Sequence, residues 1–326
     1  MSERQWIVPS VAITLLSGGA GISLIPDRSG LWPALAILPA WMCCAALIAA
    51  VYGFLWMAVN GVERPVAEFR RIFIEHRRQV LAVAGVMLLA GLNMIAFMWV
   101  KPLLNYWMPF SADVWLANAD NVLFLGHDPG RLLSAFAFPQ AGLVYHPVWF
   151  ALIILSLLIV ATAPPSPEKS AAMLSYFALW SAVGPIIHSL LPAAGPVFYE
   201  RLGLGDRFAA VDGGAETRQV ADYLWNIYAT RSFGAGAGIS AMPSLHVTMA
   251  AWTVIVARTF APRLTMPMAA CALLIAILSV ALGWHYAVDG IVGAGAALGC
   301  YLGFRELLRR RHYQVNRAIP FSPLAG

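Results

Sequence analysis

Long runs of apolar residues, separated by short polar or basic segments, form the main pattern along this chain of 326 residues. A bilayer core about 30 Å thick is crossed by a helix of roughly 20 apolar residues. Runs of that length predict eight transmembrane helices, give or take one, at 7–25, 31–59, 80–100, 143–163, 171–192, 241–261, 264–284 and 286–304. The expected fold class is therefore all-α, a polytopic membrane helical bundle.

The composition excludes the main alternative classes. Hydrophobic residues make up 60% of the chain and charged residues 11%, whereas soluble domains have about 45–50% apolar and about 25% charged residues. A soluble globule and a disordered chain are both excluded. The four cysteines lie inside apolar runs, and no Cys/His spacing indicates zinc. We therefore expect no disulfide framework, no metal site and no cofactor.

The formal net charge of +5 comes largely from arginines that the predicted helices place on one side. They cluster in segment 60–79 and in the tail 305–326, on the same side as Arg4 and Lys169. By the positive-inside rule this side is the cytoplasm, so both termini are cytoplasmic and no nucleic-acid partner is needed. The chain has no Asn-x-Ser/Thr sequon, and we expect a bacterial inner-membrane protein.

The opposite, periplasmic side carries two longer segments, 101–142 and 193–240, which are rich in aromatic residues, proline and glycine. They suit a cap at the membrane–water interface. Three groups of ionisable residues also fall on this side, where such residues are functional candidates. Lys101 follows the third predicted helix, His246 begins the sixth, and His285 with Asp289 begins the eighth. Residues far apart in sequence therefore converge on one face.

Each group has a chemical logic. Pro243 suits the first turn of a helix, which would place Ser244 and His246 beside free N–H groups that favour an anion. His285 and Asp289 are four residues apart, so on a helix they share a face. The carboxylate can then hold one ring nitrogen and leave the other as a nucleophile.

The remaining groups supply proton transfer and charge. His246 could protonate a leaving oxygen, and Lys101 could hold a phosphate as a point charge. Taken singly, each residue has an ordinary explanation: an interfacial histidine, a snorkelling lysine or a helix cap. Taken together, they predict a metal-free phosphoryl-transfer site. The other histidines lack such a context and are interpreted as structural or solvated, namely His76, His127, His146, His188 and His312.

At these positions the sequence resembles the type 2 phosphatidic acid phosphatase (PAP2) superfamily, whose signatures are K-x6-R-P, P-S-G-H and S-R-x5-H-x3-D. The first corresponds to Lys101 with Pro109, the second to Pro243-Ser244-Leu245-His246, and the third to His285 with Asp289. The resemblance covers roughly 80–304 and implies a PAP2-like core of six helices. Leu245 in place of glycine and the His-Tyr-x-x-Asp wording resemble the branch that contains inositol phosphorylceramide synthases.

The resemblance also implies roles. His285 would form a phosphohistidine, Asp289 would orient it and His246 would be the general acid and base, while Lys101 and Ser244 would contact phosphate. Two motif arginines are absent, because Met108 and Ser279 occupy their positions. Further phosphate-binding candidates in the outer segment are Arg201, Arg207 and Arg231.

The expected organisation has three parts: two N-terminal helices with an Arg-rich amphipathic segment (1–79), a catalytic membrane domain (80–304) and a basic cytoplasmic tail (305–326). With one motif cation left, the site favours a phosphodiester over a phosphomonoester dianion, and thus head-group transfer over hydrolysis. The partners expected are a lipid from the bilayer and an acceptor, either water or a hydroxyl compound. The alternatives are a phosphatase for phosphatidate or polyprenyl phosphate and, in another class, a transporter or lipid-binding protein.

Overall fold

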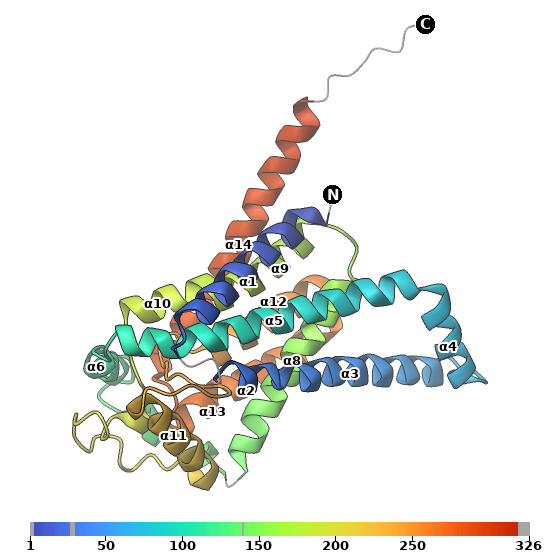
Figure 1. Cartoon of the computed structure of the whole chain (residues 1–326). Helices are drawn as coiled ribbons and strands as arrows, with labels where there is room; N and C mark the ends of the chain where they lie inside the picture. The colour runs from blue at the N-terminus through green and yellow to red at the C-terminus, as the bar shows by residue number, and fades with distance from the viewer. Residues whose placement is uncertain (1–2, 27–29, 139, 319–326) are drawn as a thin grey trace, which may run out of the picture.

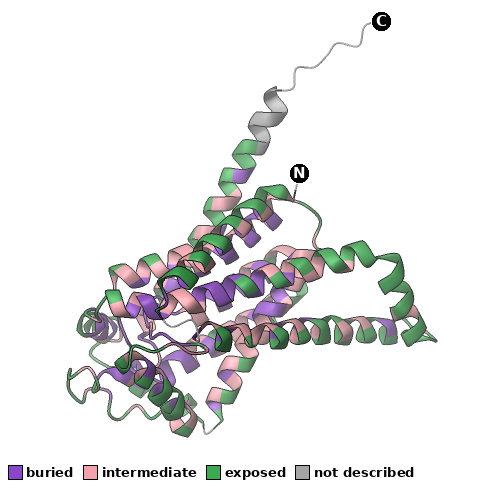
Figure 2. Cartoon of the chain, viewed as in Figure 1, coloured by how far each residue is buried: buried purple, intermediate pink, exposed green. Residues whose placement is uncertain are grey.

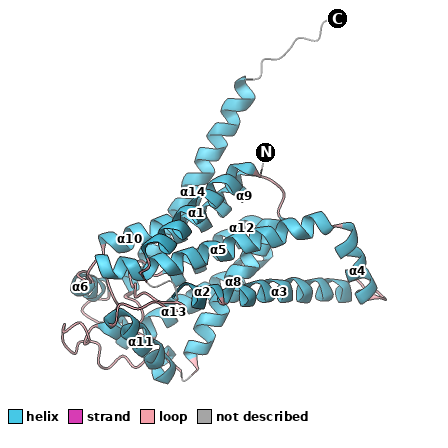
Figure 3. Cartoon of the chain, in the orientation of Figure 1, coloured by secondary structure: helices cyan, strands magenta, loops and turns pink. Residues whose placement is uncertain are grey.

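The computed structural model describes residues 3–26, 30–138 and 140–318, with side chains described as far as Arg311. Within these residues all regular secondary structure is helical (Figure 3). This confirms the predicted all-α class. Because the bilayer offers no hydrogen-bond partners, helices that satisfy their own backbone groups are one of the few structures that cross it.

Seven segments of the described chain are long and apolar enough to cross a membrane. They are α1 (Arg4–Leu24), α2 with α3 (Leu31–Leu35 and Ile37–Val59), α5 (Arg77–Trp107), α8 (Ala141–Thr162), α9 with η3 and α10 (Pro167–Ala178, Leu179–Val183 and Gly184–Leu190), η5 with α13 (Pro262–Leu264 and Thr265–Ala281), and α14 (Ala287–Ala318). An eighth apolar helix, α12 (Leu245–Phe260), is shorter. These segments correspond to the eight predicted helices.

Helix α12 lies at the centre of the bundle and contacts α8, α9, α13 and α14. Its Trp252 is fully buried and donates from Nε1 to the Ala172 carbonyl at 3.0 Å. Between membrane helices, close packing and such hydrogen bonds replace the hydrophobic effect as the force of association. The short helix that begins with the predicted acid/base motif is thus held on all sides by longer ones.

The N-terminal helices α1 and α3 pack against α5 (Figure 1). A buried amide links α1 to the rest of the bundle: Asn93 Nδ2 donates to Thr14 Oγ1 at 3.0 Å and to Ser181 Oγ at 2.7 Å. A buried polar side chain on an apolar helix is stable only with such partners. The first helix is therefore joined to the core by directional contacts as well as by packing.

Basic helix ends gather at one end of the bundle. Lys169 pairs with Glu3 at 2.9 Å, and Arg309 pairs with Glu168 at 2.5 Å, which joins the start of α1 and of α9 to the end of α14. Helix α4 (Pro65–Glu75), the predicted amphipathic segment, has no buried residue. It lies at the end of α3 and α5 away from α6 (Asp113–Leu123) and α11 (Gly214–Ala229), as Figures 1 and 2 show.

One prediction about a helix start is wrong. Pro243 does not lie in the first turn of a helix, because α12 begins at Leu245 with Ser244 as its N-cap. The segment predicted as a basic tail from residue 305 continues the last helix, since α14 runs to Ala318. Of the predicted tail, residues 319–326 and the side chain of Arg317 lie outside what the structure describes, as does that of His312.

Candidate active site

A cavity of about 440 Å³ lies between the helical bundle and segment 193–240. Its walls are mostly apolar, with the rings of Trp149, Trp180, Phe198 and Trp284 among them. Four basic side chains also line it: Lys101 from α5, His146 from α8, His246 from α12 and His285 from the turn before α14. The structure therefore brings together the lysine and both histidines that the sequence pattern singled out.

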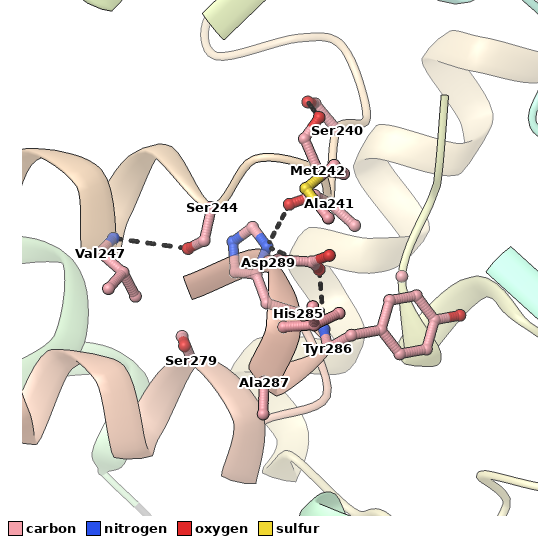
Figure 4. Close-up of polar contacts among 12 residues, drawn as sticks. Ser240, Ala241, Met242, Ser244, Val247, Ser279, His285, Tyr286, Ala287 and Asp289 are labelled. Carbon is pink, nitrogen blue, oxygen red and sulfur yellow. Dashed lines mark hydrogen bonds and ion pairs between the residues drawn. The ribbon is translucent and has the colours of Figure 1, made fainter. Parts of the chain in front are cut away.

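The turn between α13 and α14 fixes the orientation of the His285 ring (Figure 4). The ring is 5% exposed, and its Nδ1 lies 2.8 Å from the Ala241 carbonyl oxygen. Because a carbonyl can only accept, Nδ1 carries the proton and donates. Among the described residues none is within hydrogen-bond distance of Nε2. The hydrogen bond from Nδ1 leaves Nε2 as the ring nitrogen that can act on a substrate.

Asp289 forms an ion-pair contact with the His285 ring, although His285 precedes the first residue of α14 and the two residues do not lie on one regular helix. Asp289 Oδ2 lies 3.7 Å from His285 Nδ1 and accepts a hydrogen bond from the Tyr286 N–H at 2.8 Å. The carboxylate is fully buried. It therefore holds the backbone of the turn by a hydrogen bond and places its negative charge beside the His285 ring.

The His246 ring lies among aromatic side chains of α8. Its centroid is 4.7 Å from that of Tyr145, in a stacked arrangement, and 4.3 Å from that of Trp149. Trp149 Nε1 also donates to the backbone carbonyl of His246 at 3.0 Å. The centroids of His246 and His285 are 6.1 Å apart. That separation leaves room for one phosphate group to contact both rings.

Ser244 is fully buried and caps α12, where its Oγ accepts from the Val247 N–H at 3.4 Å. Its own N–H donates to the Asp289 carbonyl at 3.2 Å, which ties the start of α12 to the first turn of α14. Ser244 does not line the cavity. Its hydroxyl is engaged in the helix cap that sequence reasoning expected to be open to an anion.

Lys101 faces the cavity from the outer part of α5. No carboxylate lies within ion-pair distance of it in the part of the chain that the structure describes. The loop at Gly238 packs directly over its stem: φ is +92°, and a Cβ there would lie 2.8 Å from Lys101 Cγ. Glycine is needed at this position for both reasons, and the close loop holds the lysine against the cavity.

The three outer arginines do not line the cavity. Arg201 pairs with Asp222 at 2.5 Å and lies over the ring of Trp225. Arg207 pairs with Asp128 at 2.6 Å. Arg231 lies in the turn after α11, with φ at +52°. Lys101 is therefore the one lysine or arginine among the described residues that line this cavity.

His146, which the sequence pattern indicated as structural or solvated, also lines the cavity. Its ring centroid lies 5.3 Å from that of His246 and 6.5 Å from that of Trp284. No motif marked it, since it stands alone in an apolar run before Pro147. Its position could have drawn attention to it, because His146 lies near the start of the predicted span 143–163, at the end of the bundle where the other candidate residues were expected.

A second buried network holds the loop that contributes the Ala241 carbonyl. Asn105 Oδ1 accepts from the Ile239 N–H at 2.7 Å, and its Nδ2 donates to the Ile239 carbonyl at 2.6 Å. His188 lies between Asn105 and Ser240, at 3.2 and 3.1 Å. His188 is thus structural, as expected. The described residues include no cluster of three or more His, Cys, Asp or Glu side chains suited to a metal ion.

The cavity, its basic side chains and the helical bundle together define the class of protein. The family model described as the PAP2 superfamily matches residues 115–303, and the chain belongs to this superfamily. The superfamily consists generally of phosphatases and phosphotransferases, which supports an enzyme. A search of curated proteins and a search of solved structures each found no match.

Proposed function

We propose that the protein is a membrane enzyme that transfers a phosphoryl unit from a lipid-linked phosphate or phosphodiester through a phosphohistidine at His285. One observation carries the proposal: Lys101 of α5, His246 of α12 and His285 of the turn before α14 are far apart in the sequence but line the same mostly apolar cavity. Phosphoryl transfer depends chiefly on positioning and charge stabilisation, which rigid helix ends can supply.

In the first step Nε2 of His285 attacks phosphorus, a P–N bond forms and the bond to the leaving oxygen breaks. His246 donates the proton that the leaving oxygen takes up. In the second step the oxygen of water or of an acceptor hydroxyl attacks the phosphohistidine, and His246 takes its proton. Breaking of the P–N bond returns His285 to its starting state. Asp289 stabilises the charge that develops on the ring.

The charge around the cavity supports a phosphodiester, and therefore head-group transfer over hydrolysis. A phosphomonoester dianion requires more cationic partners than a diester monoanion. Lys101 is the single lysine or arginine among the described lining residues, while Arg201 and Arg207 pair with carboxylates elsewhere. Ser244 remains a candidate for stabilising the anion through the helix start that it caps.

The apolar walls support a lipid substrate that enters from the bilayer, with its acyl chains beside the bundle. The resemblance to the inositol phosphorylceramide synthase branch makes phosphatidylinositol as donor and ceramide as acceptor the first pair to try. The gathering of basic helix ends opposite the cavity supports cytoplasmic termini and a periplasmic site in a bacterial inner membrane.

The test is incubation of the purified full chain with a lipid panel that includes phosphatidic acid, a polyprenyl phosphate and phosphatidylinositol, with and without ceramide or diacylglycerol as acceptor. Mass spectrometry of the products separates head-group transfer from hydrolysis. We expect a transferred head group, and none with the His285→Ala variant. Release of free phosphate alone would favour the phosphatase. Lipid movement across vesicles by the inactive variant would favour a transporter.

A further inference from the structure

Helix α6 lies outside the membrane-spanning segments and carries two buried carboxylates, Asp113 and Asp120, each 2% exposed. They are seven residues apart, close to two helical turns, so they point to the same side of the helix. Both accept hydrogen bonds from residues that directly follow His285: Asp113 from Tyr286, and Asp120 from Ala287 and Val288. Nothing in the phosphohistidine chemistry described above uses either of them.

Asp120 caps α14 from a distance of more than 160 residues along the chain. Its Oδ2 accepts from the Ala287 N–H at 2.7 Å and its Oδ1 from the Val288 N–H at 2.9 Å. These are the first two N–H groups of the helix, which have no partner within it. Burial raises the pKa of the Asp120 carboxyl, and these hydrogen bonds oppose that shift.

Asp113 holds the other side of the same turn. It accepts from the Tyr286 hydroxyl at 2.9 Å and from the backbone N–H groups of Ala194 and Gly195, the latter at 2.8 Å. Burial raises the pKa of the Asp113 carboxyl, with the backbone hydrogen bonds and Tyr286 opposing the shift.

Gly195 brings the outer segment into direct contact with the turn. Its φ is +104°, and a Cβ there would lie 2.4 Å from the Trp284 carbonyl oxygen. The outer segment is thereby pressed against the residue before His285, with Asp113 holding it there. Residues 284–288 are then fixed by α6 on one side and by the Ala241 carbonyl on the other.

A helix start needs only one small polar cap for stability. Two buried carboxylates supplied from another helix cost more desolvation than a local serine or threonine cap would. Their hydrogen bonds reach Tyr286, Ala287 and Val288, the residues that follow His285. On the other side of His285, Asp113 accepts from the N–H of Gly195, which packs against the Trp284 carbonyl. We propose that Asp113 and Asp120 are positioning residues, which hold the His285 ring so that Nε2 points into the cavity.

This inference rests on the proposed function, since it takes His285 as the group that attacks phosphorus. The probe is orthovanadate, which adopts the five-coordinate geometry of phosphoryl transfer, titrated into the purified full chain and followed by calorimetry. We expect Asp120→Asn to weaken vanadate binding about tenfold, because the amide turns a donor toward one of the two N–H groups and displaces the ring. Asp113→Asn should weaken it in the same direction, and Asp120→Ala more strongly.

Asp128→Asn is the matched control, since Asp128 is a largely buried carboxylate of the same outer region that pairs with Arg207 and does not touch the turn. Its vanadate affinity should equal that of the wild type. With a lipid that the wild-type protein converts, Asp120→Asn should lower kcat about tenfold and leave KM within about twofold. A merely structural residue would lower the thermal midpoint without this split. The asparagine variants keep the side-chain shape, so they carry the test if the alanine variant does not fold.

Wild-type vanadate affinity and kcat in both Asp120→Asn and Asp113→Asn would overturn the inference, and so would an equal loss in Asp128→Asn. Failure of the proposed function has a different signature, since His285→Ala would then bind vanadate and turn over lipid like the wild type.

Discussion

The two histidines with proposed catalytic roles, His246 and His285, are held by different forces. The His285 turn is fixed by directional hydrogen bonds, from its Nδ1 to Ala241 and from its neighbouring backbone to Asp120. The His246 ring packs against Tyr145 and Trp149, and among the described residues its contacts are aromatic. Hydrogen bonds set the angle of a ring, whereas packing sets its place and leaves more freedom of tilt. The proposed nucleophile, His285, needs a fixed ring angle. The proposed proton donor, His246, acts on two different oxygens in turn and can use some freedom of tilt.

Of the substitutions around His246, the histidine held by aromatic packing, His246→Ala should have the largest effect. Removing the general acid and base should lower the rate of head-group transfer by about 10²- to 10⁴-fold, with the protein still folded. His246→Gln, which keeps size and polarity without proton transfer at neutral pH, should lose nearly as much. The measurement is product formation by mass spectrometry beside a thermal melt. Transfer within twofold of wild type in either variant would remove His246 from the mechanism.

Lys101→Met tests the anion that the two histidines are proposed to share. A hydrogen bond to a charged group contributes about 1.5–3 kcal/mol, so KM for the lipid should rise about 10- to 100-fold. Lys101→Arg keeps the charge and should recover part of the loss. An unchanged KM for Lys101→Met would mean that the phosphate does not lie beside this lysine.

Tyr145 offers a matched pair of variants for the packing around His246. The Tyr145 ring is fully buried, and its hydroxyl has no hydrogen-bond partner among the described residues. Tyr145→Ala should therefore cost about 3–5 kcal/mol of unfolding free energy and lower activity through a displaced His246. Tyr145→Phe keeps the stacked ring and should match or exceed the wild type in stability. Chemical denaturation in detergent measures both, and a large loss in Tyr145→Phe would show that the hydroxyl is used.

The smallest effect is expected for Arg201→Ala. Arg201 pairs with Asp222 and its side chain is 34% exposed, and such pairs contribute about 0–1 kcal/mol. Transfer should stay within about twofold of wild type. A loss similar to that of Lys101→Met would instead place Arg201 on the phosphate during turnover, in a conformation different from this one.

Much of the fold followed from the sequence because apolar runs of bilayer length admit few alternatives. The predicted spans correspond to the observed helices, and the facing of Lys101, His246 and His285 follows from their common end of the bundle. The error at Pro243 is of another kind. Proline is favoured at the first position of a helix, and serine is favoured as the N-cap, so Pro243-Ser244 allowed a helix start at either Pro243 or Leu245.

The parts that sequence reasoning missed depend on the rotation of helices and the path of the outer segment. His146 reaches the cavity only because of how α8 is turned against α12. Nothing in the local sequence around Asp113 and Asp120 indicates a contact with the residues after His285. That contact exists because α6 packs beside the start of α14. The choice among three outer arginines likewise depended on carboxylates, such as Asp222 and Asp128, that no local pattern connects to them.

The most direct test of the central claim is a search for the covalent intermediate itself. The purified chain would be mixed with a turned-over lipid, quenched in base, where phosphohistidine survives, and mapped by peptide mass spectrometry. We expect a phosphoryl adduct on His285 that accumulates when acceptor is withheld, disappears when it is added, and is absent from His285→Ala. An adduct on another residue, or full transfer activity in His285→Ala, would contradict it.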